Sequence, residues 1–227
     1  GLNRLNLSDR ISQIIPLSQL KPPDGQGSIA ITFRKDDERF NKIRSLFTPS
    51  VVFAGAGVGN KNLCTKATID ALRDCEICLY DSLMDHKLLE ELPSTAEAID
   101  VGKRCGAHSK QQQVITDLLC DRARRGKKVI RLKGGDPGIF GRLTEETTAL
   151  EELQIAYRVI PGISALQAAT TGTGMLLTRR DVSRGFVALT PRAAAGKLAP
   201  CDANEKSTLP IVYYMSIKAM DHITKEL

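Results

Sequence analysis

The sequence predicts an α/β protein built on a mostly parallel sheet with helices on both faces. From residue 51 onward, short apolar runs alternate with segments of helical periodicity, and the connections between them are short. Glycine-rich or charged motifs follow the apolar runs directly. Parallel strands end at one shared edge of a sheet, and ligands of such folds bind there. We therefore expect the motifs to meet along that edge.

The expected elements fill residues 51–160. In chain order they are a strand at 51–54, a helix at 66–72, a strand at 77–80, a short helix at 86–92, a strand at 98–101, a helix at 110–125, a strand at 129–132, a helix at 144–153 and a strand at 157–160. The helix at 110–125 has the clearest apolar periodicity, and Gly126 is suited to cap its carboxyl end. Pro161 and Gly162 stop the last strand.

Beyond residue 162 the pattern begins again, which indicates the start of a second α/β domain that is incomplete at residue 227. The elements expected there are a helix at 165–170, a strand at 186–190, a polar loop at 193–207 and a strand at 211–214. A polar turn at 48–50 separates a short N-terminal α/β fragment from the rest. The predicted organisation is an N-terminal fragment at 1–49, a first α/β domain at 50–162 and a second, truncated α/β domain at 163–227.

The composition narrows the class of protein. The chain has 227 residues, of which 42% are hydrophobic, and a net charge of +6. No run approaches the ~18 consecutive apolar residues of a membrane span, and no signal-peptide pattern opens the chain, so we expect a cytoplasmic protein with no membrane partner. The densest basic cluster, at 122–128, reads as the solvated end of a helix, so we expect no nucleic-acid partner either.

The cysteines do not indicate a metal site. Cys75 and Cys78 form a C-x-x-C pair, but no second pair of ligands stands at zinc spacing. The apolar run around Cys78 is typical of a buried strand, in which a cysteine is a small hydrophobic residue. Six scattered cysteines in a chain of this length predict reduced thiols, and we expect no metal.

Three loops that follow predicted strands suit a ligand. Gly55-Ala56-Gly57-Val58-Gly59 lets the backbone turn sharply and approach a nucleotide closely. Residues 131–142, Arg-Leu-Lys-Gly-Gly-Asp-Pro-Gly-Ile-Phe-Gly-Arg, hold more glycine than a purely structural turn needs, and Asp136 among them is able to accept from a ribose hydroxyl or an amino group. The turn at 161–165 leads into a helix whose first amides suit polar ligand groups, although an interdomain hinge has the same composition.

Two further strands end in charged residues. Asp81 follows the strand at 77–80, and it suits either a general base or the N-cap of the next helix. Lys103 follows the strand at 98–101, and it suits a proton donor, an anion ligand or an ordinary surface lysine. The first glycine loop and Asp81 also admit a nicotinamide enzyme, but such a loop has the spacing G-x-G-x-x-G instead of G-x-G-x-G.

These five segments in this order, together with Leu176-Leu177-Thr178-Arg179-Arg180-Asp181, resemble the tetrapyrrole methylase family, most closely its uroporphyrinogen-III C-methyltransferases. The resemblance covers residues 51–227. It implies two α/β domains with S-adenosylmethionine and an anionic tetrapyrrole in the cleft between them, and a homodimer. The implied reaction transfers methyl groups to two ring carbons of uroporphyrinogen III and gives precorrin-2, in siroheme and corrin biosynthesis.

The resemblance also implies roles for single residues. Asp81 takes the position of the proton acceptor and Lys103 that of the proton donor. The residues in cofactor-binding positions are Val58, Gly134, Gly135, Asp136, Ile139, Ser164, Ala165 and Met215. The chain departs from the family at 57–60, where Gly-Val-Gly-Asn replaces the usual Gly-Pro-Gly-Asp, and the family pattern continues for some tens of residues beyond Leu227.

The first 48 residues resemble a short piece of a different enzyme, porphobilinogen deaminase (hydroxymethylbilane synthase). The similarity lies in Leu-Ser-Asp-Arg-Ile at 7–11 and in Pro-Asp-Gly-Gln-Gly-Ser-Ile-Ala-Ile at 23–31. The deaminase's cofactor-carrying cysteine region is absent from the sequence, so we expect no deaminase activity. Three alternatives to uroporphyrinogen-III methylation stay open: methylation of another corrin-pathway intermediate, a nicotinamide-dependent oxidoreductase, and an inactive scaffolding module of a fused protein.

Overall fold

The computed structural model describes residues 2–13, 50–102, 108–191 and 209–226. Contacts divide the chain into two units, Gly1–Leu46 and Phe47–Leu227. The described part of the first unit holds two short 3-10 helices, η1 (Leu2–Leu5) and η2 (Ser8–Arg10). The predicted domain boundary at residues 162 and 163 falls inside the second unit and stays a prediction.

The second unit carries the expected alternation of strands and helices. Its elements are β1 (Val51–Gly55), η4 (Lys61–Leu63), α2 (Lys66–Leu72), β2 (Ile77–Tyr80), η5 (His86–Glu91), β3 (Glu97–Asp100), α3 (His108–Arg124), β4 (Val129–Lys133), α4 (Leu143–Glu152), β5 (Tyr157–Ile160), α5 (Ala165–Ala169), η6 (Thr171–Thr173), β6 (Val187–Leu189), β7 (Ile211–Tyr213), η7 (Ile217–Ala219) and α6 (Met220–Glu226). The predicted loop at 193–207 lies outside the described residues.

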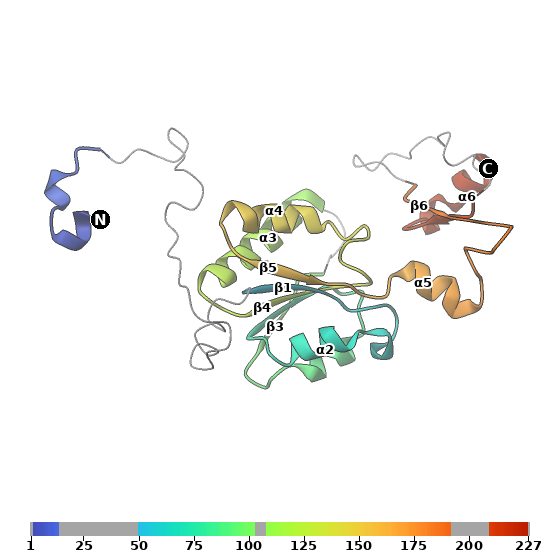
Figure 1. The fold of residues 1–227 in the computed structure, drawn as a ribbon, viewed down its shortest axis with the longest axis horizontal. Coiled ribbons are helices and arrows are strands. Elements are labelled where there is room, and N and C mark those ends of the chain that lie inside the picture. Colours follow the sequence, from blue (N-terminus) through green and yellow to red (C-terminus); the bar gives the residue numbers. More distant parts are fainter. Residues whose placement is uncertain (1, 14–49, 103–107, 192–208, 227) are drawn as a thin grey trace. The chain divides into compact units, whose positions relative to one another are not determined.

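Five strands form one parallel sheet in the order β3-β2-β4-β1-β5 (Figure 1). The parallel α/β fold predicted from the sequence is therefore confirmed. In the central strand β4, Arg131 lies opposite Phe53 of β1 and Leu79 of β2. All five β4 residues are buried, as expected for a parallel strand covered on both faces.

Helices cover both faces of the sheet (Figure 1), and each face has its own apolar core. One core joins Leu72 of α2 and Leu88 of η5 to strand residues that include Leu132. The other joins Leu119 of α3 and Leu150 of α4 to the opposite face of the strands. Because side chains alternate along a strand, Arg131 and Lys133 point to the α3 and α4 face.

One predicted helix has a different geometry. Residues 86–91 form the 3-10 helix η5 instead of an α-helix. The Asp85 side chain caps its start by accepting from the amide of Lys87, and Pro93 follows two residues after its end. A segment this short between a cap and a proline favours the tighter helix.

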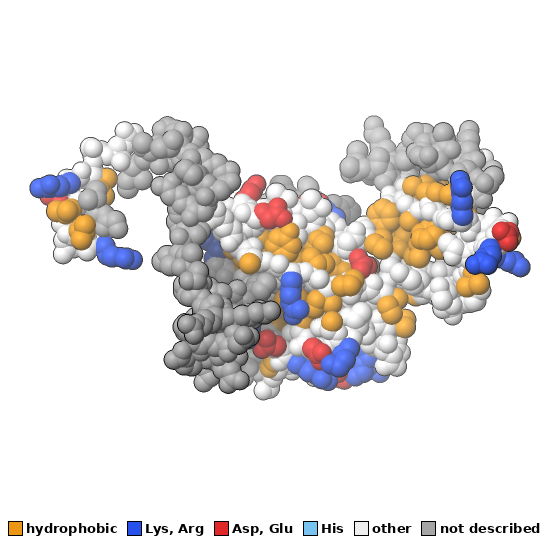
Figure 2. All heavy atoms as spheres, viewed as in Figure 1, with side chains coloured by type: hydrophobic (Ala, Val, Ile, Leu, Met, Phe, Trp, Pro, Cys, Tyr) orange, Lys and Arg blue, Asp and Glu red, His pale blue; other side chains and the backbone are white. Residues whose placement is uncertain are grey.

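The described residues after 162, at 163–191 and 209–226, pack less tightly than the main sheet. Strands β6 and β7 pair in parallel, and every residue in them is only half-buried. Large hydrophobic side chains are exposed in this part, including Met175, Leu176, Val182 and Ile217, and Figure 2 shows such side chains gathered at its surface. None of the helices in the described ranges combines the length and apolarity of a membrane span.

Candidate functional site

The loops after β1 and β4 are joined by backbone hydrogen bonds at the carboxyl edge of the sheet. The amide of Gly57 donates to the Gly135 carbonyl at 3.3 Å, and the amide of Gly135 donates to the Gly57 carbonyl at 2.8 Å. Both residues have positive φ, 70° and 69°, which only glycine adopts without strain. Val58 is half-buried and follows this bridge directly, so the predicted cofactor residues of the two loops lie close together.

Asp136 connects the β4 loop to the turn after β5. Its Oδ2 accepts from the amide of Gly162 at 3.0 Å, and its Oδ1 accepts from the amide of Gly138 at 2.8 Å. A Cβ on Gly162 would lie 2.2 Å from the Gly135 carbonyl oxygen, so only a glycine at 162 lets this turn approach the β4 loop so closely. Each carboxylate oxygen has a second lone pair, and the predicted bond to a ligand stays a prediction.

The turn after β5 brings Ser164 and Ala165 beside the β4 loop. A Cβ built on Gly135 would lie 3.8 Å from Ser164 Cα and 3.9 Å from the Ala165 nitrogen. Ser164 is buried, and its Oγ lies 2.5 Å from the hydroxyl of Tyr214, which follows β7. Met215, the next residue, has an exposed side chain and a positive φ of 55°. Met215 therefore follows directly a residue that is tied to these loops.

Tyr214 makes two more contacts that close this group. Its hydroxyl accepts from the amide of Leu166 at 3.3 Å, and its ring lies 4.8 Å from the ring of Phe140 between centroids. Phe140 belongs to the β4 loop, next to the exposed predicted cofactor residue Ile139. The cofactor-binding residues predicted from the sequence therefore share one neighbourhood, although no ligand contact is tested.

Asp81 lies directly after β2 at the same edge. Its Oδ1 accepts from Nη2 of Arg131 at 2.6 Å, and its side chain is 29% exposed. The adjacent segment reaches the β4 loop, because a Cβ on Gly134 would lie 3.8 Å from the carbonyl oxygen of Leu83. Lys103, the predicted proton donor, lies outside the described residues, so its distance from Asp81 stays untested.

Behind Asp81 lies a buried charged network that the sequence reasoning did not find. Glu146 of α4 is fully buried, and its Oε1 accepts from Nε of Arg131 at 3.3 Å and from Nζ of Lys133 at 3.1 Å. Nε2 of Gln112 on α3 donates to the same oxygen at 3.0 Å. The signal was visible in the sequence, because two cations in a strand buried on both faces require a buried carboxylate nearby.

Burial has a further effect on Lys133. Removal from water, with the positive charge of Arg131 nearby, lowers the pKa of its ammonium, and the carboxylates of Glu146 and Asp81 act in the opposite direction. The network holds two cations, Arg131 and Lys133, and two carboxylates, so its formal charges cancel. Such a balanced cluster is stable only while every member stays in place.

The Cys75 and Cys78 thiols are both buried and unpaired with each other. Desolvation by burial raises the pKa of Cys75 to about 11 and the pKa of Cys78 to about 12, so both stay protonated near neutral pH. Across the described ranges, no three potential metal-ligating side chains cluster as they would around a metal ion.

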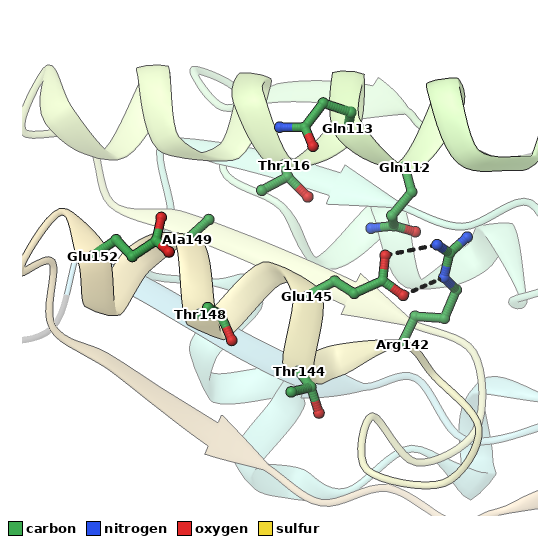
Figure 3. Close-up of a pocket in the computed structure, with 9 residues that line it drawn as sticks. All are labelled: Gln112, Gln113, Thr116, Arg142, Thr144, Glu145, Thr148, Ala149 and Glu152. Atoms are coloured by element: carbon green, nitrogen blue, oxygen red, sulfur yellow. Dashed lines mark hydrogen bonds and ion pairs between the residues drawn. The ribbon is translucent and has the colours of Figure 1, made fainter.

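A groove of about 580 Å³ lies between α3 and α4 (Figure 3). Its lining is mostly polar, and Arg142 forms a two-point ion pair with Glu145 there, with distances of 2.7 and 2.6 Å. The groove occupies the helical layer, whereas the predicted site residues occupy the strand ends. Arg142 ends the β4 loop, so this groove adjoins the site without containing its predicted residues.

A family model matches most of this chain. The model of the Tetrapyrrole (Corrin/Porphyrin) Methylases matches residues 50–227, more than three-quarters of the chain. The chain belongs to the tetrapyrrole methylase family. The resemblance inferred from the five strand-end motifs is confirmed. Residues 1–42 match a different model, the dipyromethane cofactor binding domain of porphobilinogen deaminase, which agrees with the second resemblance seen in the sequence.

The methylase's relatives carry consistent names. A uroporphyrinogen-III C-methyltransferase of Methanocaldococcus jannaschii is 38% identical over 181 residues, which cover 79% of this chain and 75% of the relative. Siroheme synthase 1 of Aeromonas hydrophila is 39% identical over 78% of this chain, and the chain spans 39% of its length. A solved uroporphyrin-III C-methyltransferase of Thermus thermophilus in complex with S-adenosyl homocysteine has a TM-score of 0.66 at 33% identity, covering 78% of this chain and 74% of that one.

Proposed function

We propose that residues 50–227 form a methylase module that transfers methyl groups from S-adenosylmethionine to ring carbons of uroporphyrinogen III, giving precorrin-2. The relatives' names support this substrate and cofactor, because the family model matches residues 50–227 and these relatives match over about three-quarters of their own length. The geometry adds independent support. Glycine loops, a carboxylate and a helix-opening turn converge at the carboxyl edge of a parallel sheet, where ligands of such folds bind.

The open space around Gly134 is the single observation that favours a ligand at the β4 loop. Gly134 has neither a positive φ nor a close neighbour, since its nearest atom to an added Cβ lies 3.8 Å away. The protein's own packing therefore does not require glycine there. A missing side chain leaves the backbone of the β4 loop open to close approach by a cofactor.

The strand-end loops and Asp81 would have different parts in the reaction. When bound, S-adenosylmethionine supplies a methyl group that leaves sulfur as its bond to the ring carbon forms, with sulfur keeping the electron pair. The loops after β1, β4 and β5 orient the reactants, and alignment supplies much of the rate gain. Asp81 accepts the proton that the methylated ring releases, and its partial exposure beside the β4 loop suits that role.

The remaining roles follow the family resemblance. Val58, Gly134, Gly135, Asp136, Ile139, Ser164, Ala165 and Met215 would bind the cofactor, and Lys103 would donate a proton. The module would divide into domains at residue 163, act as a homodimer in the cytoplasm and bind its tetrapyrrole through that substrate's carboxylates. Sedimentation of the purified chain tests the homodimer, and a monomer at micromolar concentration would contradict it.

Cofactor binding tests the proposal directly. Calorimetric titration of the chain should show binding of S-adenosylhomocysteine and no comparable binding of NAD. With uroporphyrinogen III as substrate, mass spectrometry should show two added methyl groups. Tighter binding of NAD would favour the nicotinamide alternative, and binding of neither ligand would contradict both.

A matched pair of glycine substitutions sharpens the test. Gly134→Ala should leave stability within about 0.5 kcal/mol, because its Cβ meets only ordinary contacts, yet weaken S-adenosylhomocysteine at least roughly tenfold by filling the space beside the loop. Gly172→Ala is the control, since it lies in η6 and the nearest atom to its Cβ is the carbonyl oxygen of Gln167 in α5, 3.8 Å away. Equal affinity in both variants would argue against a cofactor at the β4 loop.

A further inference from the structure

Arg131 is the side chain through which the interior of the sheet reaches Asp81. Its side chain is 3% exposed, and Nη2 donates to Asp81 Oδ1 at 2.6 Å. A second nitrogen of the group, Nε, donates to Oε1 of Glu146 at 3.3 Å. Nη1 donates to the carbonyl of Leu132 at 3.1 Å. One planar group thus binds two carboxylates and the backbone, which fixes its orientation.

Glu146 anchors this arrangement from the helical layer. Its carboxylate is fully buried, and besides Arg131 it binds Lys133 at 3.1 and 3.2 Å and Gln112 at 3.0 Å. With so many donors on one carboxylate, Glu146 has little freedom to turn. The path from α4 through Glu146 and Arg131 to Asp81 is therefore a chain of charge-assisted bonds that is buried at Glu146 and Arg131 and reaches the partly exposed Asp81.

The carboxylate of Asp81 is held in the structure by its hydrogen bond with Arg131. It follows the last residue of β2, and its amide donates to the Leu132 carbonyl at 3.2 Å, which fixes its backbone. Among the side chains that the structure describes, Arg131 is the one that hydrogen-bonds to the Asp81 carboxylate. The bond uses Oδ1, and the Asp81 side chain is 29% exposed.

We propose that Arg131 is a positioning residue for the methyl-transfer reaction, held by the buried carboxylate of Glu146 and holding in turn the carboxylate of Asp81 where it can accept a proton. This inference rests on the proposed function, because it assigns Arg131 a purpose through the role of Asp81. Arg131 acts through Asp81 and does not touch the substrate. A substitution should therefore lower kcat while cofactor affinity stays unchanged.

The main test is Arg131→Lys. A lysine ammonium keeps the charge, but it lacks the planar fork that reaches Asp81 and Glu146 together. We expect kcat with uroporphyrinogen III to fall on the order of 100-fold, since misplacing a catalytic group by about 1 Å has that effect. The affinity for S-adenosylhomocysteine should change less than about threefold. Arg125→Lys is the control, because Arg125 forms an exposed ion pair with Asp121, and it should leave both quantities unchanged.

A double-mutant cycle with Asp81→Asn identifies the residue through which Arg131 acts. If Arg131 works through Asp81, then adding Arg131→Lys to Asp81→Asn should lower kcat no further. Losses that multiply would overturn the proposal, and so would an Arg131→Lys enzyme of normal kcat. Glu146→Gln keeps hydrogen bonding but removes the anchoring charge, and it should give a kcat between those of the wild type and Arg131→Lys.

A stability cycle separates failure of this inference from failure of the proposed function. If the wild-type chain does not methylate uroporphyrinogen III, the proposed function fails, and urea unfolding of the same four proteins still tests the contact. The midpoint shift of the double variant should then be smaller than the sum of the two single shifts. Additive shifts would show that Arg131 does not hold Asp81 and would overturn the inference.

Discussion

Residues 50–162 and residues 163–226 differ in how firmly they hold their parts of the candidate site. In the first region the central strand is buried along its whole length, and each face of the sheet has a closed apolar core. In the second region no residue of β6 or β7 is fully buried, and Met215 is 69% exposed. Asp81, the proposed proton acceptor, thus follows a strand of a firmly packed sheet, whereas Met215 lies in a more exposed part of the chain beside Tyr214.

This difference has a physical origin. Two packed cores and a balanced charge network cannot adjust independently, because close-packed interiors transmit any displacement. A two-stranded sheet with half-buried residues has few such constraints. Substitutions in the first region should therefore cost far more stability than matched ones in the second. Substitutions in the second region should have the larger effect on cofactor affinity.

The largest expected effect is that of Glu146→Ala. The substitution leaves Arg131 and Lys133 buried without their shared carboxylate, and breaking a buried charged cluster costs about 3–5 kcal/mol. Glu145→Ala is the matched control on the same helical turn. Glu145 is half exposed and pairs with Arg142 at the surface, so its loss should cost less than about 1 kcal/mol. Urea unfolding measures the loss of stability in both variants. Similar losses would show that the two cations do not depend on the buried carboxylate of Glu146.

A pair of phenylalanines compares the two regions directly. Phe53 of β1 is fully buried and packs edge-to-face against Tyr157 at 5.7 Å between ring centroids, so Phe53→Ala should cost about 3–4 kcal/mol. Phe186, beside β6, is 41% exposed, so Phe186→Ala should cost about 1 kcal/mol or less. Thermal or urea unfolding decides the outcome. Equal losses would mean that the second region is packed as firmly as the first.

Alkaline pH should lower the free energy of unfolding through the buried thiol of Cys78 in the first region. Burial, followed by the neighbouring Cys75, raises the pKa of Cys78 from 9.0 to about 12. The unfolded chain then releases this proton from pH 9 upward, while the folded chain keeps it. The stability that Cys78 contributes is therefore complete below pH 9 and is lost as pH rises toward 12, on the order of 2–3 kcal/mol by pH 11.

Comparison with Cys78→Ala isolates this contribution. The variant should show a shallower decline of unfolding free energy between pH 9 and 11, whatever its stability at pH 7. Lys133 acts with the opposite sign, because the lowered pKa of its ammonium relieves a cost as pH approaches 10.5. Both proteins retain Lys133, so the difference between their slopes reports Cys78 alone. Parallel slopes would contradict a buried, protonated thiol.

The fold was predictable because strands and helices alternate with clear boundaries. Glycine and proline mark the strand ends at 55, 134 and 161, and β2 and β5 have the predicted bounds. Parallel pairing places all the strand ends at one edge, so the neighbourhood of the site also followed from the sequence. The tetrapyrrole methylase family was recognisable from the order of these motifs.

The partners of the site residues were not predictable in the same way. Glu146 stands in the first turn of α4, where an acid is expected to favour the helix dipole, and its link to Arg131 exists only once α4 crosses β4. Asp136 read as a ligand, yet its carboxylate joins two loops through backbone amides. Contacts between residues distant in sequence depend on the crossover geometry, which local patterns do not encode.

The smallest stability effect, with the clearest effect on affinity, is expected for Tyr214→Phe. The change removes the hydroxyl that binds Ser164 Oγ at 2.5 Å and the Leu166 amide at 3.3 Å, but it keeps the ring beside Phe140. Loss of these bonds should cost about 1 kcal/mol. Since Tyr214 binds Ser164 and precedes Met215, both proposed cofactor residues, we expect the affinity for S-adenosylhomocysteine to fall roughly fivefold to tenfold by calorimetry.

Tyr157→Phe is the matched control in the first region. Tyr157 opens β5, at the end of the strand opposite the strand-end loops, and its hydroxyl donates to Glu151 at 2.6 Å on the surface. Its loss should therefore change stability slightly and affinity not at all. If Tyr214→Phe binds S-adenosylhomocysteine as tightly as Tyr157→Phe does, then the second region does not position the cofactor through Tyr214. Met215 would then lose its proposed role, and the firmly packed loops of the first region would account for binding on their own.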